Sequence, residues 1–217
     1  SFTLTGSIGT MTVDIQYTTQ TYTVTFNEKG LSSGVTWWVD LGGVNESATA
    51  PNVIVFTGVP MQYAISYTAD SPITVNGNTQ YQSNNAQGLI SVTGNTTQTI
   101  SYTTYYLVNV QYTNGLGTSN PGSAWVKAGT TETFELTPEE DYYIPTPYSS
   151  YITASSSLSV GYSSISTTTT GNTIEYSVPV TVNGPGTVYV NAQWFDFEDY
   201  ITASGYPSSG WEFVVYQ

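Results

Sequence analysis

The chain has 217 residues and a formal net charge of −13, with 15 acidic residues, two lysines and no histidine or cysteine. Two cationic side chains cannot neutralise a phosphate backbone, which excludes nucleic-acid binding; the missing histidine and cysteine exclude disulfides, thiol catalysis and the commonest general base. Charged residues make up 8%, against about 25% in soluble proteins, so we expect an extracellular protein whose surface depends little on ionisation.

The N-terminal residues 1–17 read SFTLTGSIGTMTVDIQY and alternate apolar and polar side chains, as a half-buried strand does. The phase flips after Gly9-Thr10, which predicts one strand that changes face, or two strands that meet at a bulge or hinge. Because the segment carries no charged side chain before Asp14, it suits pairing with a sheet edge, in its own subunit or in a neighbour. The alternating positions before the flip are Phe2, Leu4, Gly6 and Ile8.

The rest of the chain consists of short runs rich in Thr, Val, Ile, Tyr, Phe and Trp, separated by Gly, Asn and Pro turns. The runs that we predict as strands are residues 22–26, 36–41, 52–56, 61–67, 107–112, 131–136, 173–180, 187–194 and 212–216. This pattern predicts an all-β fold, an immunoglobulin-like or pilin-like β-sandwich.

Two segments of the chain share one order of features: a strand, a loop with Gly-Leu, and a strand with Trp. The first reads YTVTFNEKGLSSGVTWWVDL from Tyr22, and the second reads LVNVQYTNGLGTSNPGSAWV from Leu107. The spacing of about 85 residues matches a small immunoglobulin-like unit. We expect an N-terminal strand and hinge over residues 1–20, a first lobe over 21–104 and a second over 105–217. The alternative is a single larger sandwich in which the echo is chance.

Two kinds of covalent modification have candidate residues. The sequons Asn45-Glu46-Ser47 and Asn95-Thr96-Thr97 are acceptors for N-linked glycans, and we expect at least one to be occupied in an extracellular protein. Lys29 and Lys127 each lie near one of the repeated segments. They are candidates for isopeptide bonds to an asparagine or aspartate through a neighbouring carboxylic acid, and an exposed lysine is the alternative.

Any catalysis would rest on carboxylates and tyrosines. The acidic clusters are Glu139, Glu140 and Asp141, and Asp196, Glu198 and Asp199. Neither cluster lies in a loop of the acid-protease type, and neither has EF-hand spacing, so we predict no catalytic residue, no metal site and no cofactor.

The aromatic residues offer a different interpretation, because rings on the face of a β-sandwich can bind sugars. Trp37 and Trp38 are neighbours on one predicted strand, so their side chains point to opposite faces and one is expected to fill the core. The remaining tryptophans are Trp125, Trp194 and Trp211.

The run Tyr22–Leu41 resembles a module that is common in secreted archaeal proteins, including surface-layer-associated proteins and proteins related to the acid protease thermopsin. The run Gly122–Phe134, GSAWVKAGTTETF, resembles another module of the same proteins. The two runs cover about 15% of the chain and indicate a secreted β module. Lys29 departs from the commoner module sequence, which has an uncharged residue there.

The alternating N-terminal strand and the Thr- and Tyr-rich sandwiches together are similar to the subunit of the archaeal thread filament. This resemblance implies a glycosylated pilin whose donor strand, here Phe2, Leu4, Gly6 and Ile8, completes the sheet of the next subunit. We therefore expect a non-enzymatic subunit of an extracellular cell-surface filament, a helical homopolymer of identical subunits without a membrane span. The alternative is a monomeric adhesin, a carbohydrate-binding module or a surface-layer-associated β module.

Overall fold

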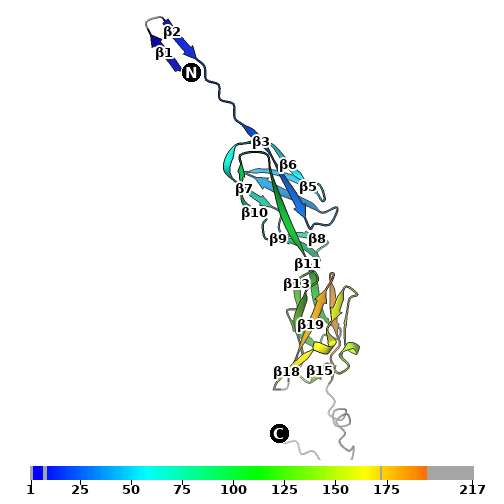
Figure 1. The fold of residues 1–217 in the computed structure, drawn as a ribbon. Coiled ribbons are helices and arrows are strands. Elements are labelled where there is room, and N and C mark those ends of the chain that lie inside the picture. The colour runs from blue at the N-terminus through cyan, green and yellow to red at the C-terminus, as the bar shows by residue number, and fades with distance from the viewer. Residues whose placement is uncertain (1, 7–8, 172, 195–217) are drawn as a thin grey trace, which may run out of the picture. The chain divides into compact units, whose positions relative to one another are not determined.

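Figure 1 shows a computed structural model of the chain, which describes residues 2–6, 9–171 and 173–194, with side chains from residue 14 onward. Within these ranges the fold is almost entirely β, which confirms the predicted fold class. The chain divides into two compact units: residues 1–73 and 81–102 form unit 1, and residues 74–80 and 103–217 form unit 2. Among the described residues, no helix is long and apolar enough to cross a membrane.

Unit 1 consists of two sheets. One has the strand order β10-β7-β4-β5 and is antiparallel; the other has the order β11-β3-β6, in which β3 is antiparallel to β6 and parallel to β11. The hairpin β8–β9 pairs with β11 through β9, and its residues 74–80 belong to unit 2. The strands are β3 (Thr21–Lys29), β4 (Thr36–Leu41), β5 (Val44–Thr49), β6 (Ile54–Pro60), β7 (Gln62–Ala69), β8 (Ile73–Val75), β9 (Thr79–Ser83), β10 (Gln87–Val92) and β11 (Thr96–Tyr112).

The core of unit 1 follows from the alternation along its strands. Val24 and Phe26 of β3 are fully buried, and so are Trp37 and Val39 of β4. Phe26 contacts Tyr67 of the opposite sheet, with ring centroids 5.3 Å apart, so the two sheets pack face to face. As expected for neighbours on one strand, Trp37 fills the core while the side chain after it is half-buried.

Unit 2 also has two sheets, of order β16-β20-β11-β13 and β12-β14-β19-β17, with β18 pairing to β19. Phe134, Leu136, Val178 and Val188 are fully buried in one continuous apolar cluster. The further elements are β12 (Gly117–Asn120), β13 (Ser123–Lys127), β14 (Thr131–Pro138), β15 (Tyr142–Tyr143), η1 (Tyr148–Ser150), β16 (Ile152–Ala154), β17 (Leu158–Val160), η2 (Tyr162–Ser164), β18 (Ser166–Thr170), β19 (Thr173–Val182), β20 (Gly186–Val190) and β21 (Gln193–Trp194).

The N-terminal segment forms a hairpin of its own, β1 (Phe2–Gly6) and β2 (Gly9–Val13). The phase flip in the sequence therefore separates two paired strands. The register pairs apolar residues with apolar residues and threonines with threonines: Phe2 with Val13, Leu4 with Met11, Thr3 with Thr12, and Thr5 with Thr10.

Candidate functional site

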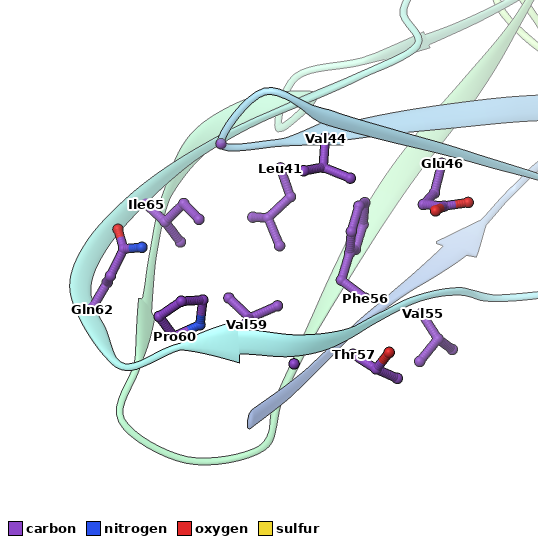
Figure 2. Close-up of a pocket in the computed structure, with 12 residues that line it drawn as sticks. Leu41, Val44, Glu46, Val55, Phe56, Thr57, Val59, Pro60, Gln62 and Ile65 are labelled. Atoms are coloured by element: carbon purple, nitrogen blue, oxygen red, sulfur yellow. The ribbon is translucent and has the colours of Figure 1, made fainter. Parts of the chain in front are cut away.

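The candidate site is a groove in unit 1, between the edge strands of its two sheets, with a volume of about 330 Å³. On the described residues β5 pairs only with β4, and β6 pairs only with β3. Each strand therefore leaves a row of backbone N–H and C=O groups without a ladder partner, which is the usual template for an added strand. We call this feature the β5–β6 groove (Figure 2).

The floor of the β5–β6 groove is part of the hydrophobic core. Leu41, Phe56 and Val59 line it and are buried, and Phe56 packs edge-on against the central ring of Phe26 at 5.9 Å between centroids. Val44 lies on β5 opposite Leu41 in the register, but it is 56% exposed because nothing covers the outer side of its strand. Figure 2 shows these apolar side chains around one hollow, with Ile65 closing one end.

Local backbone chemistry shapes both edges of the groove. The β4–β5 turn uses Gly42 and Gly43, both at positive φ, and the Gly43 N–H donates to Asp40 Oδ1 at 2.9 Å. A side chain at Gly42 would press on Ile65, with a Cβ 2.8 Å from Cδ1, so the glycine lets Ile65 reach the groove. On β6 the register shifts beside Gly58, which has φ +69, and this irregularity bends the edge.

Glu46 is the single titratable residue among the side chains that line the groove. It lies on β5 opposite Val39, whose side chain is fully buried, so its register position is one that faces the core. The sequence singled out Glu46 only as the middle residue of a sequon. Its place in the groove follows from the pairing of β5 with β4.

The predicted donor residues lie in β1, except that Ile8 falls outside the described residues. Phe2, Leu4 and Gly6 pair with β2 and not with β5 or β6. Residues 14–20 connect this hairpin to β3 and are all exposed. The Met61 N–H donates to the Gln20 carbonyl at 3.0 Å, so the connecting segment reaches unit 1 beside the Pro60 end of the groove.

The two sequons differ in their surroundings. Asn45 is exposed on β5, beside the groove, and its sequon lies within an edge strand instead of a loop. Asn95 is exposed in the turn before β11, where its Oδ1 accepts the Thr23 N–H at 2.9 Å. An N-linked glycan attaches at the side-chain nitrogen Nδ2, and this hydrogen bond involves only the side-chain oxygen of Asn95.

Lys29 and Lys127 are exposed at the ends of β3 and β13. No ion pair joins either ammonium group to another described residue. Isopeptide bonds at these lysines stay a prediction.

The described acidic residues outside the groove do not gather as metal ligands. Glu139, Glu140 and Asp141 are exposed after β14, and no group of three potential metal ligands gathers among the described residues. Asp196, Glu198 and Asp199 fall outside the described residues. Burial raises the pKa of Asp70, whose backbone carbonyl accepts the Tyr102 hydroxyl at 2.8 Å, away from the groove lining.

The described tryptophans differ in their exposure. Trp37 is in the core, Trp38 and Trp125 are half-buried, and Trp194 is 61% exposed. The Trp194 ring is nearly perpendicular to the neighbouring Tyr142 ring, at 88°. Trp211 falls outside the described residues.

Comparison with known protein families and with curated proteins finds no match for this chain.

Proposed function

We propose that the protein is a structural subunit of an extracellular filament, in which the N-terminal strand of one copy occupies the β5–β6 groove of the next. The observation that carries this proposal is the groove itself: a hollow with an apolar floor, flanked by two strands that each lack a ladder partner on one side among the described residues. The occupant to which we commit is residues 2–8 of a second copy of this chain.

The chemistry of the two parts is complementary. Among the residues that line the groove there is one charged side chain, Glu46, and residues 1–13 contain no charged side chain. Strand β6 has the same length as the segment Phe2–Ile8, so a strand of that length can pair along the whole edge. Gly6 would let the added strand approach the groove closely where a side chain would collide.

The energetic terms favour occupation. Burying the side chains of Phe2, Leu4 and Ile8 in the groove would contribute up to about 1.5–3 kcal/mol each. Each ladder hydrogen bond contributes about 0.5–1.5 kcal/mol. Against these terms stand the cost of ordering the exposed connecting residues 14–20 and the loss of the β1–β2 ladder.

Self-pairing of β1 with β2 has a consequence for assembly. A free donor strand is a hazard, since it pairs with any open edge. Because β1 already has a partner in β2, donation exchanges one ladder for another, and the groove must supply the difference through apolar burial. The exposed sequons at Asn45 and Asn95 suit a glycosylated, extracellular filament.

The test uses two charge substitutions that act on opposite sides of the joint. Leu4→Lys places a charge in the donor strand, and Val44→Lys places one in the groove. We expect each variant to remain folded and monomeric, because removing a lysine ammonium from water costs more than pairing with Glu46 returns. The matched controls are Thr3→Lys, the neighbour of Leu4 in β1, and Leu89→Lys, an exposed residue of β10 outside the groove lining. Both controls are expected to form filaments in negative-stain electron microscopy.

Mixing the two variants shows whether the donor strand occupies the groove of another subunit or the groove of its own subunit. The Val44→Lys chain keeps an intact donor, and the Leu4→Lys chain keeps an intact groove, so the mixture should form discrete dimers in sedimentation. Filaments of normal length from Leu4→Lys, or monomers from the unmodified protein and from the mixture alike, would contradict the proposal. The second outcome would favour the monomeric alternative.

A further inference from the structure

Glu46 occupies an unusual position for a carboxylate. Its neighbours in the register of β5 are Val44, opposite buried Leu41, and Ala48, opposite buried Trp37. Glu46 itself lies opposite Val39, which is fully buried. The side chain is exposed because β5 is an edge strand, and Figure 2 shows it beside the hollow on the same strand as Val44.

Among the described residues, no positively charged side chain lines the groove to compensate the Glu46 carboxylate. The other lining residues of β4, β5, β6 and β7 are apolar or uncharged, and neither Lys29 nor Lys127 lines the groove. On the neighbouring strand β4, the Asp40 carboxylate is held by the Gly43 N–H. The titratable side chains of β7 are those of Tyr63, which is exposed, and Tyr67, which is buried against Phe26. The incoming residues 1–13 carry no ionisable side chain.

We propose that occupation of the β5–β6 groove takes up a proton at Glu46, so that the joint between subunits tightens in acid and loosens toward neutral pH. This inference rests on the proposed function and names the regulation of its site. Covering Glu46 with an uncharged strand removes its carboxylate from water without a partner, which is costly for the ionised form and much less so for the neutral acid.

The direction follows from linkage. The occupied state favours the protonated carboxyl, so occupation binds a proton wherever the empty groove holds Glu46 ionised. Where occupation takes up a proton, the dissociation constant rises by up to about tenfold for each unit of pH, and the affinity reaches a plateau at the acid end. At neutral pH a carboxylate on the core-facing side of β5 also hinders unrelated strands from pairing with the open edge.

The experiment measures groove occupation directly in the full chain. The acceptor is the Leu4→Lys protein, which keeps its groove and carries a donor that remains charged over the whole pH range. The probe is a fluorescent, N-acetylated peptide with the sequence of residues 1–13, and the readout is its anisotropy at a series of pH values from about 7 to about 4. The test variant adds Glu46→Gln, and the matched control adds Glu139→Gln, an exposed residue that does not line the groove.

We expect the peptide to bind the acceptor at least tenfold more tightly at the acid end of this series than at neutral pH. Glu46→Gln should bind at neutral pH as tightly as the parent does in acid, with a flat pH profile, while Glu139→Gln keeps the parent profile. If the Glu46→Gln profile keeps the parent slope, the inference is wrong and the proposed function stands. If the peptide binds neither the parent nor Glu46→Gln at any pH, both are overturned.

Discussion

Units 1 and 2 arrange their strands in the same order. In unit 1 β3 lies between β11 and β6, and in unit 2 β11 lies between β20 and β13. β3 is parallel to β11, and β11 is parallel to β20. The opposite sheets correspond as well, since β10-β7-β4 matches β19-β14-β12.

The similarity between the two sequence segments agrees only in part with this correspondence of strands. The strands β3 and β11 are equivalent by sequence and by position in the fold. The same holds for the loops with Gly30-Leu31 and Gly115-Leu116. The sequence aligns the strand of Trp37 with the strand of Trp125, but in the fold β4 corresponds to β12, while β13 corresponds to β6. The shared sequence motif therefore identifies the start of each unit correctly. Its second half, the strand with Trp, aligns strands that are not equivalent in the fold.

The units differ at the edge next to these strands. Unit 1 adds β5 outside β4 and leaves a groove between β5 and β6. In unit 2 the equivalent strands β12 and β13 are joined by the short turn through Pro121-Gly122, and the Gly122 carbonyl accepts the Val110 N–H at 2.9 Å. The exposed aliphatic side chains that the structure describes all belong to unit 1: Ile15, Val44, Val53, Val55, Met61 and Leu89. The comparison teaches that one strand order can have different edges: a hollow between β5 and β6 in unit 1, and a short turn between β12 and β13 in unit 2.

The largest expected effect tests whether the two cores are independent. Phe26 and Phe134 are both fully buried, one in each unit. Replacing either with alanine should lower the free energy of unfolding of its own unit by about 3–5 kcal/mol, since each change leaves a cavity. We expect calorimetry to resolve two transitions, with Phe26→Ala shifting one and Phe134→Ala the other.

The leucine variants Phe26→Leu and Phe134→Leu serve as controls, because they keep most of the side-chain volume and should shift the same transitions by less. A single transition that all four variants shift together would show that the units unfold as one cooperative body. That result would break the comparison.

A second pair of substitutions tests the equivalent Gly-Leu loops. Gly30 has φ +103 and Gly115 has φ +73, so alanine at Gly115 should cost about 1–2 kcal/mol of stability. Alanine at Gly30 should cost more, because its Cβ would collide with the Tyr102 carbonyl oxygen, while nothing lies near a Cβ at Gly115. Chemical denaturation of the two variants measures the difference. Equal losses would mean that the Gly30 loop relaxes away from Tyr102.

The smallest expected effect concerns one buried tyrosine hydroxyl in each unit. The Tyr102 hydroxyl donates to the Asp70 carbonyl at 2.8 Å, whereas the buried Tyr112 hydroxyl has no hydrogen-bond partner among the described residues. Tyr102→Phe should therefore lower stability by about 0.5–1.5 kcal/mol, and Tyr112→Phe should be neutral or stabilising. Denaturant titration distinguishes the two, and a clear loss from Tyr112→Phe would contradict this account.

Alkaline titration of these variants sharpens the result. Burial is the largest cause that raises the pKa of both Tyr102 and Tyr112 above the ordinary value of 10.0. A tyrosine whose pKa is raised in the folded state contributes stability that is fully present below its ordinary pKa. This stability is lost as the pH rises through the pKa of the folded state. We therefore expect unfolding in strong base, at a higher pH in either phenylalanine variant.

Much of the strand pattern was predictable, because it depends on neighbours in the sequence. The run Thr36–Leu41 was predicted as a strand and is β4, and residues 131–136 fall within β14. The run Asn52–Phe56 is apolar on both faces at Val53, Ile54, Val55 and Phe56. Both valines are exposed, Val53 before β6 and Val55 within it, as expected for an edge strand.

The sequence by itself determined the all-β class, the positions of most strands and an N-terminal segment without charge, since each follows from local alternation and composition. Only the tertiary structure decided that residues 96–112 form one strand, that β5 and β6 border one groove, and that Glu46 lies on its core-facing side. The physical reason is that strand order and register are set by pairing between distant segments. A shift of one residue in the register of β5 would turn Glu46 outward and Asn45 into the groove.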